Sequence, residues 1–501
     1  MSSTAPDPHR AVKTAKAGLW TVGARLGSKV LDFLALLLLA RFLGPADFGL
    51  VAMAMTAVFI VEAILELPLG AALIRIETLT PRMFDTAFTL GALRGVIIAS
   101  ALGLAALPLA QFYNETKLVP LICALALAPI LRGLMSPRMV IFAKKMDFRR
   151  DVILEISGKV LSLSAAVALA LATGSYWAIV IGTVGGPLVM TLLSYILAPL
   201  RPRLTLKDWP VFADMIGWNM LSQIFSAINW QIDRILLPRF IDVSTFGRYA
   251  TANDLSAIPY QAIAAPVLRP LLVAYTDARQ DGSLTDTYLK SSHAIVWVMA
   301  PIFAFMGVMA LPLIQLFLGT QWLEAAPMLS GLSWISLIAL PVIPLAPLAM
   351  SLNRTRLVTL RTFIEFIVKL PFTLVGIFLF GIAGAIAARA LASLAVLASS
   401  LAAVKTMTAI SIRHQLIAVM RPLAGLCPAI LFLFAVLPWV QNAPTPLLQL
   451  ALLAFTGVLY LLITASFSYI LWLVCGKPVG AEGFIAKTLR QRLPSPFNAL
   501  F

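Results

Sequence analysis

The chain is a succession of long apolar runs separated by short polar breaks. A helix needs about 20 mostly apolar residues to cross the hydrocarbon of a membrane, and the chain holds about fourteen runs of that length. We place them at 18–40, 48–74, 84–110, 118–142, 152–173, 176–200, 214–237, 246–275, 291–318, 324–350, 357–380, 382–404, 416–439 and 446–474. The runs lack the alternation of a membrane strand. They therefore predict an all-α polytopic membrane protein with about 14 transmembrane helices.

Composition agrees with lipid as the solvent. Of the 501 residues, 60% are hydrophobic and only 12% are charged, which is too little polar surface to cover a soluble globule. No break exceeds about 20 residues, so there is no room for a soluble catalytic or nucleotide-binding domain. The 3 cysteines and 3 histidines are scattered, so we expect neither a disulfide framework nor a metal site, and no cofactor.

Basic residues gather on alternate connections between the runs. That set is Arg10, Lys13, Lys16, Arg75, Arg82, Arg138, Lys144, Lys145, Arg149, Arg150, Arg201, Arg203, Lys207, Arg354, Arg356, Lys405, Arg413, Lys487, Arg490 and Arg492. By the positive-inside rule these connections are cytoplasmic, and both termini are predicted in the cytoplasm. The net charge of +16 is then explained by anionic lipid at the inner leaflet, and no nucleic acid partner is expected.

A short polar corner occurs twice, as "LLARFLGPADFG" at 38–49 and "LLPRFIDVSTFG" at 236–247. The matches in register are Trp20 with Trp218, Ser28 with Ser226, Arg41 with Arg239, Phe42 with Phe240, Phe48 with Phe246, Gly49 with Gly247 and Pro68 with Pro266. Apolar helices share Leu and Ala by chance, but matched Trp, Arg, Phe-Gly and Pro are harder to obtain that way. We therefore predict a duplication into two parallel copies of about six spans each.

The duplication sets the expected organisation of the chain. It predicts a cytoplasmic N-terminal segment at 1–17, an N-lobe at 18–200, a linker at 201–213, a C-lobe at 214–405, two extra spans within 416–474 and a cytoplasmic tail at 475–501. The first run contains Arg25, Lys29 and Asp32 and ends without an A-x-A-like cleavage site, which favours a retained span over a secretory signal.

Several motifs in order resemble a known family. They are "ARFLGPADFGLVAMA", "LPLGAALIR", "FAKKMDFRRDVILE" and "NWQIDRILLPRFIDVSTFGRYATANDLSAIPYQAIAAPVLRPLL". Over 15–405 the chain resembles the polysaccharide transporter family of lipid-linked oligosaccharide flippases, the Wzx-like branch of the multidrug/oligosaccharidyl-lipid/polysaccharide superfamily. One departure is visible: Asp242 and Val243 stand where the first corner has Gly44 and Pro45, so the two turns are expected to differ.

The resemblance implies a function. It implies two six-helix lobes around a central cavity, and translocation of undecaprenyl-diphosphate-linked oligosaccharide repeat units across the bacterial inner membrane for exopolysaccharide, capsule or lipopolysaccharide biosynthesis. The partners it implies are that lipid-linked oligosaccharide and membrane lipids. A polysaccharide polymerase and a chain-length regulator are candidate protein partners.

Charges inside the spans are the candidate site. A charge at the bilayer centre costs about 2.5–3.5 kcal/mol, so it normally faces a bundle interior or a wet cavity. Arg25, Lys29 and Asp32 are spaced to share one helical face. The candidates for binding the diphosphate are Arg25, Lys29, Arg94 and Arg269. The candidates for ion coupling are Asp32, Glu62, Glu66 and Asp254.

Plainer explanations exist for many of these charges. Glu155 with Lys159, and Glu365 with Lys369, are i, i+4 pairs that need no function. Arg41 and Arg239, at the corners, fit interfacial anchors, and Asp233 and Arg234 fit a pair within one lobe. Each acidic candidate could equally serve to neutralise a neighbouring base.

Two other classes of function remain open at this stage. A drug or metabolite antiporter would share the duplicated architecture. A membrane-embedded polymerase or ligase would need acid/base groups in a sizeable outward loop, and the predicted outward loops are short. The sequence has no phosphate-loop motif, so a carrier would draw on an ion gradient, the membrane potential or removal of product.

Overall fold

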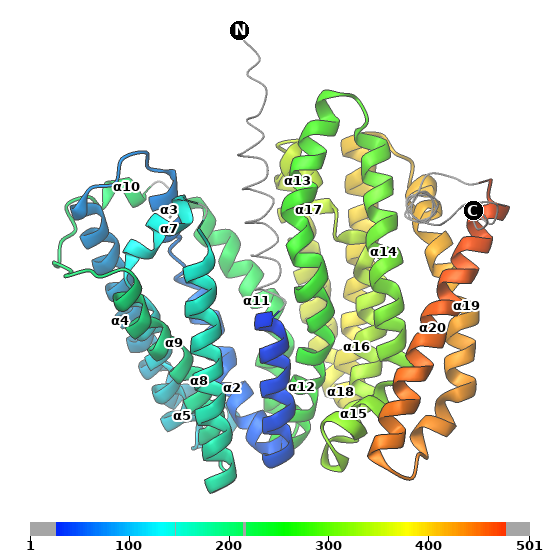
Figure 1. The fold of residues 1–501 in the computed structure, drawn as a ribbon, viewed down its shortest axis with the longest axis horizontal. Helices are drawn as coiled ribbons and strands as arrows, with labels where there is room; N and C mark the ends of the chain where they lie inside the picture. Colours follow the sequence, from blue (N-terminus) through cyan, green and yellow to red (C-terminus); the bar gives the residue numbers. More distant parts are fainter. Residues whose placement is uncertain (1–26, 146, 214–216, 477–501) are drawn as a thin grey trace, which may run out of the picture. The chain divides into compact units, whose positions relative to one another are not determined.

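The computed structural model describes residues 27–145, 147–213 and 217–476. Within these ranges every regular element is a helix, and 10 helices are long and apolar enough to cross a membrane (Figure 1). The count is 11 if Leu118–Gly133 and Pro137–Lys144, which meet at 50°, form one bent span. The all-helical membrane fold is thus confirmed, whereas the total of fourteen spans stays a prediction.

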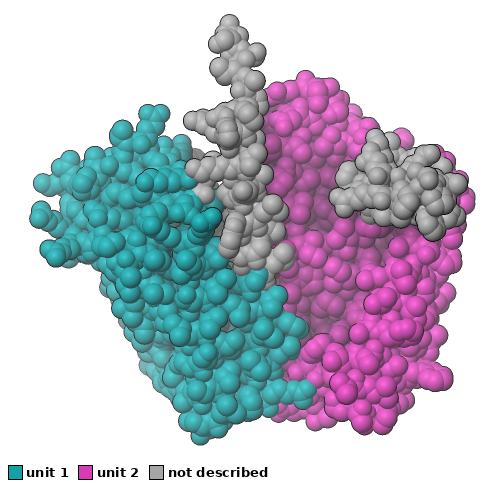
Figure 2. Space-filling model, in the orientation of Figure 1, with its two compact units in different colours: residues 1–250 teal, residues 251–501 magenta. Residues whose placement is uncertain are grey.

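The chain divides into two compact units, residues 1–250 and 251–501 (Figure 2). The first begins with a helix whose described part covers 27–42. It continues with α2 (Pro45–Ile64), α3 (Leu69–Arg75), α4 (Pro81–Tyr113), α5 (Leu118–Leu125), α6 (Leu127–Gly133), η1 (Pro137–Met139), α7 (Val140–Lys144), α8 (Arg149–Thr173), α9 (Trp177–Leu197), α10 (Pro210–Ala213), α11 (Gly217–Phe240) and the start of α12 (Val243–Pro259). The unit boundary lies inside α12, and the lobe ranges expected from the repeat remain a prediction.

Small residues let the helices of the first unit approach closely. Gly91 of α4 and Gly133 of α6 face each other, and a Cβ added to either would come closer than 3.0 Å to the other's carbonyl oxygen. Gly158 of α8 lies against Gly186 and Met190 of α9, and α8 and α9 run side by side (Figure 1). Close packing of this kind drives helix association where lipid removes the hydrophobic driving force.

The second unit contains the remaining helices. They are the rest of α12, the π-helix η2 (Tyr260–Ala264), α13 (Ala265–Gln280), α14 (Leu284–Val308), α15 (Ala310–Phe317), η3 (Thr320–Trp322), α16 (Ala325–Ala339), η4 (Leu340–Val342), α17 (Leu345–Ser351), α18 (Arg356–Thr408), α19 (Ile412–Gln441) and α20 (Pro446–Val474).

The chain reverses direction within α18. Gly381 has a non-helical backbone with φ 57° and ψ −131°. A Cβ on Gly376 would come closer than 3.0 Å to the backbone of Gly384, and the converse also holds. In a straight helix two residues eight positions apart lie about 12 Å from each other along the axis. The two arms are therefore antiparallel, and they correspond to the spans expected at 357–380 and 382–404.

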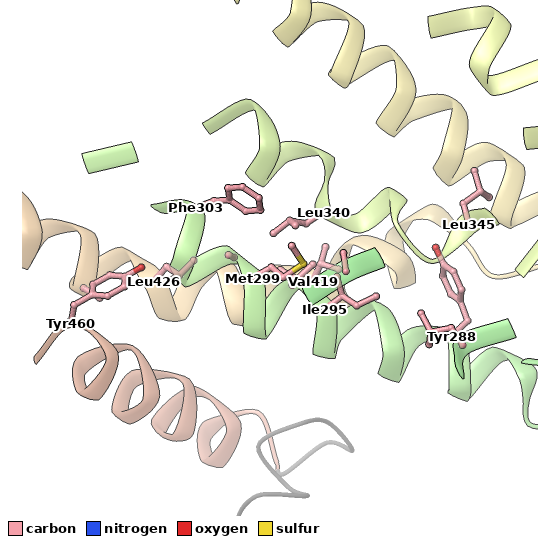
Figure 3. Packing of buried hydrophobic residues seen from close by; sticks show 14 of the residues in the cluster. Tyr288, Ile295, Met299, Phe303, Leu340, Leu345, Val419, Leu426 and Tyr460 are labelled. Atoms are coloured by element: carbon pink, nitrogen blue, oxygen red, sulfur yellow. The ribbon is translucent and has the colours of Figure 1, made fainter. Parts of the chain in front are cut away.

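The core of the second unit is built around α14. Figure 3 shows its buried side chains between those of α17, α19 and α20; the labelled ones are Tyr288, Ile295, Met299, Phe303, Leu340, Leu345, Val419, Leu426 and Tyr460. The hydroxyl of Tyr460 donates to the carbonyl oxygen of Pro301 at 2.9 Å, which ties α20 to α14. The last two helices, α19 and α20, are thus part of this core.

Candidate functional site

The two copies of the corner motif pack against each other inside the first unit. Gly49 in α2 lies against the backbone of Val243 and Gly247 in α12, and Gly247 lies against Pro45 and Gly49. A Cβ on either glycine would come closer than 3.0 Å to backbone atoms that cannot move aside easily. Next to the contact, Phe246 is fully buried. The glycines shared by the two motifs therefore allow the helices to cross in direct backbone contact.

The two turns are closed by different hydrogen bonds, as the substitution of Asp242 for Gly44 led us to expect. In the first corner the Gly44 N–H donates to Oδ2 of Asp47 at 3.0 Å. In the second, the Thr245 N–H donates to Oδ2 of Asp242 at 2.8 Å, so this aspartate caps α12. Burial raises the pKa of Asp242, but hydrogen bonds from Thr245 and the charge of Arg248 outweigh it, so the pKa lies below that of an ordinary aspartate.

A cluster of charged side chains joins the first helix to α8. We call Ser28, Lys29, Asp32, Glu155 and Lys159 the Asp32 cluster. Asp32 lies between two lysines: its Oδ1 is 2.6 Å from Nζ of Lys159, and its Oδ2 is 3.3 Å from Nζ of Lys29. Lys159 also donates to the carbonyl oxygen of Ser28 at 3.3 Å, and the Ser28 hydroxyl donates to Glu155. The cluster is held together across two helices.

The Asp32 cluster pairs each base with an acid yet remains accessible. The expected pair of Glu155 and Lys159 is present at 3.8 Å, but Lys159 lies closer to Asp32. The exposed fractions of Lys29, Asp32 and Lys159 are 36%, 44% and 26%. An entering anion would therefore compete with Asp32 for the two ammonium groups, and no buried ion pair would have to be broken first. Arg25, which was expected on this face, lies outside the described residues.

A second group of charges stands where α2 ends. Nε of Arg94 in α4 donates to the carbonyl oxygen of Leu65 at 2.6 Å, and its Nη2 donates to that of Glu62 at 3.2 Å. These are among the carbonyls that a helix leaves unpaired at its C-terminus, so Arg94 acts as a cap for α2. The Glu62 carboxylate pairs with Arg132 of α6 at 2.9 Å, and Glu66 is exposed beside them.

The candidates of the second unit come from three helices. Arg389 of α18 donates to Oδ1 of Asn253 in α12 at 2.6 Å, whereas the neighbouring Asp254 is exposed. Arg269 of α13 is exposed and makes no hydrogen bond or ion pair with any described residue. Further along the chain, Glu365 pairs with Arg361 at 3.3 Å, one helical turn before it.

A buried histidine that the sequence left without a role joins α14 to α19. His293 is 4% exposed; its Nδ1 is 2.8 Å from the carbonyl oxygen of Ala418 and its Nε2 is 3.1 Å from Nη2 of Arg421. Arginine can only donate, so Nε2 accepts and the proton lies on Nδ1. Within the described ranges no three His, Cys, Asp or Glu side chains gather closely enough to hold a metal ion.

Comparison with known proteins places the chain among polysaccharide biosynthesis proteins. It is 25% identical over 313 residues to the succinoglycan biosynthesis transport protein ExoT of Rhizobium meliloti (strain 1021), covering 62% of this chain and 63% of that protein. It is 24% identical over 284 residues to the teichuronic acid biosynthesis protein TuaB of Bacillus subtilis (strain 168), covering 54% of this chain and 57% of that protein. The matched region thus spans less than two thirds of either relative.

The fold is similar to that of a solved flippase, and the sequence matches a family. The structure of the lipid II flippase MurJ in an inward closed conformation superposes with a TM-score of 0.69 and 15% identity, covering 90% of this chain and 98% of that one. At this identity the likeness shows the fold alone. The sequence pattern of the family described as "Polysaccharide biosynthesis protein" matches residues 38–327, more than half of the chain. This confirms the resemblance seen in the sequence: the chain belongs to the polysaccharide biosynthesis protein family.

Proposed function

We propose that the protein is a flippase that moves undecaprenyl-diphosphate-linked oligosaccharide repeat units across the bacterial inner membrane by alternating access. One observation carries the proposal: the Asp32 cluster presents two lysines on membrane helices that are accessible and held by an exchangeable aspartate. A diphosphate cannot cross hydrocarbon unaided, and ammonium groups inside a helical bundle are what it requires. The names of the relatives and the fold support the same reading.

The proposed architecture follows the repeat. Fourteen spans would form two parallel six-helix lobes at 18–200 and 214–405 around a central cavity, followed by two further spans within 416–474. Both termini would be cytoplasmic, as the basic connections indicate. A polysaccharide polymerase and a chain-length regulator remain the candidate protein partners.

The proposed mechanism is an exchange of ion pairs. The diphosphate enters from the cytoplasmic leaflet and takes the place of Asp32 as the partner of Lys29 and Lys159, while the polyprenyl tail stays in lipid. Asp32 is thereby released, and its carboxylate becomes available to the coupling ion on the return step. Arg25 and Arg269 remain the other candidates for binding the diphosphate. Arg94 has donors left over after it caps α2, and Glu62, Glu66 and Asp254 remain the other candidates for ion coupling.

The test is complementation of a strain that lacks the gene. Lipid analysis of the deletion strain should show undecaprenyl-diphosphate oligosaccharide trapped on the inner side of the membrane. The double variant Lys29→Gln/Lys159→Gln should reduce outward delivery at least about tenfold, because a hydrogen bond to a charged group is worth about 1.5–3 kcal/mol. Membrane insertion and amount of protein should be unchanged.

A matched control separates substrate binding from the loss of an ion pair. Lys290 forms an exposed i, i+4 pair with Asp286 at 3.3 Å in α14, outside the Asp32 cluster. Lys290→Gln should therefore restore normal delivery. Full delivery by the Lys29→Gln/Lys159→Gln variant would remove these lysines from the mechanism. Absence of trapped lipid in the deletion strain would overturn the proposed substrate.

A further inference from the structure

The first unit contains an open pocket that the proposed mechanism does not use. It has a volume of about 660 Å³. Its lining residues, which we call the arginine pocket, come from the start of α4, from η1, from the end of α9 and from the segment that follows: Pro81, Asp85, Arg138, Tyr195, Pro199, Leu200, Arg201 and Arg203. None of them belongs to the Asp32 cluster.

Hydrogen bonds hold the walls of the pocket in place. Nη1 of Arg138 donates to the carbonyl oxygen of Pro199 at 2.7 Å, and the N–H of Arg203 donates to Oδ1 of Asp85 at 3.1 Å. The Tyr195 hydroxyl donates to the carbonyl oxygen of Leu134 at 2.9 Å. The segment after α9 is thus tied to both η1 and α4, and the pocket is formed before any ligand arrives.

The residues that line the pocket carry a net positive charge. Three guanidinium groups line it against the single carboxylate of Asp85. The side chains of Arg201 and Arg203 are exposed, and neither makes a hydrogen bond or ion pair with another described residue. Guanidinium groups bind phosphate oxygens with paired donors, so the lining suits a phosphate-bearing anion.

Exposed apolar side chains that neighbour the lining residues in sequence indicate a lipid. Ile196, one residue after Tyr195, is 71% exposed, and Leu204, one residue after Arg203, is 79% exposed. Trp209, a residue type typical of membrane–water interfaces, is 47% exposed in the same segment. A soluble phosphate would gain nothing from these side chains, whereas the acyl chains of a lipid would cover them.

We propose that the arginine pocket binds the phosphate-bearing headgroup of an anionic phospholipid of the bilayer, with the acyl chains lying over Ile196 and Leu204. Basic pockets between transmembrane helices on the cytoplasmic side bind lipid headgroups in this way. The site would tie the first unit to the cytoplasmic leaflet. It goes beyond the proposed function, because the ligand is a lipid of the membrane and not the transported molecule.

Lipid binding to the purified full-length protein tests this directly. Native mass spectrometry would count the phosphatidylglycerol molecules retained as that lipid is titrated, with phosphatidylcholine as the neutral lipid. Arg201→Gln/Arg203→Gln should weaken phosphatidylglycerol binding about thirtyfold. Each basic residue near an anionic surface raises the affinity about fivefold, and the two factors multiply. Arg201→Lys/Arg203→Lys keeps the charge but loses the paired donors, so its binding should lie between that of the parent protein and that of the Gln variant.

The control removes the same charge from elsewhere on the predicted cytoplasmic side. Arg356 and Arg413 in the second unit are exposed and, like Arg201, have no polar partner among the described residues. Arg356→Gln/Arg413→Gln should leave phosphatidylglycerol binding unchanged. Equal loss in this control, or no loss in Arg201→Gln/Arg203→Gln, would overturn the site.

Two competition arms identify the source of the phosphate. Inorganic phosphate should fail to displace phosphatidylglycerol, and undecaprenyl diphosphate should compete no better than phosphatidylglycerol itself. Displacement by inorganic phosphate would assign the pocket to a soluble anion, and preference for undecaprenyl diphosphate would make it an entry site for the transported lipid; either result refutes the proposal. Because no transport is measured, failure here is distinct from failure of the flippase proposal.

Discussion

Gly49 and Gly247, which occupy matching positions in the two corner motifs, lie backbone to backbone with no room for a Cβ on either. A substitution here meets main-chain atoms of Pro45 and Val243, not a flexible side chain that could turn away. The contact explains why a short motif should occur twice in one polypeptide. Each copy supplies one face of the same close helix crossing.

Gly49→Ala and Gly247→Ala should each destabilise the protein. Overpacking of a well-packed contact typically costs about 1–3 kcal/mol, and here the neighbour is backbone, so we expect the upper part of that range. The measurement is the melting temperature of the detergent-purified protein. Gly103 of α4 has nothing within 4 Å of an added Cβ. Gly103→Ala should therefore be neutral or stabilising by up to about 1 kcal/mol. An equal effect in all three variants would contradict the close contact.

The ion pair of Asp32 with Lys159 should contribute little to folding. Both side chains are partly exposed, at 44% and 26%, so solvent screens their attraction. A double-mutant cycle of Asp32→Asn and Lys159→Gln should give a coupling energy below about 1 kcal/mol. Denaturation in mild detergent measures it. A coupling of several kcal/mol would mean that the cluster serves the fold, and the loss of delivery predicted for Lys29→Gln/Lys159→Gln would then need no substrate contact.

His293 should matter more for stability than its isolation in the sequence suggests. Its replacement by Ala leaves the carbonyl oxygen of Ala418 and the guanidinium of Arg421 without the partners they have now. A buried polar group left unsatisfied costs about 1–3 kcal/mol. His414 is exposed, and among the described residues its side chain bonds to its neighbour Ser411. His414→Ala should cost less than about 0.5 kcal/mol, and equal melting temperatures for the two variants would refute this role of His293.

Asp242 should make the stability of the corner depend on pH. Its pKa is lower in the folded protein than in the unfolded chain, so the native state binds fewer protons there as the medium becomes acidic. The stabilisation is fully present above the unfolded pKa of about 3.9 and is lost as pH falls through the folded value. The stability advantage of the parent protein over Asp242→Asn should therefore shrink as the pH is lowered below about 4. A gap that stays constant with pH would show that the charge of Asp242 is not involved.

Local pattern was sufficient for the elements of the fold but not for the pairing of their charges. The apolar length of the runs predicted the helices, and the break between the runs at 357–380 and 382–404 predicted the two arms of α18, because both are properties of a short stretch of chain. By contrast, Lys159 meets Asp32 only when α8 packs on the first helix, and Arg132 meets Glu62 only when α6 packs near α2. These partners depend on tertiary packing, which spacing along the chain does not reveal.

The arginine pocket shows the same limit. The positive-inside rule predicted that Arg138, Arg201 and Arg203 lie on one side of the membrane. It could not predict that they line one pocket, because that depends on the hydrogen bond from Arg138 to Pro199, which brings two distant connections together. Arg94 is a further example: its place inside a span made it a candidate anion ligand, but the sequence could not predict that it also donates to carbonyl oxygens at the end of α2.

The tight reversal at Gly381 has a consequence for how the protein is made. No polar loop joins the two arms of α18. During synthesis, no segment between them would therefore stay in water while the second arm is still being made. Each arm alone would expose a glycine, Gly376 or Gly384, that packs against the backbone of the other arm in the folded protein. We therefore expect the pair to leave the translocon together as a preformed helical hairpin, so that this region is added to the growing protein in a single step of membrane insertion.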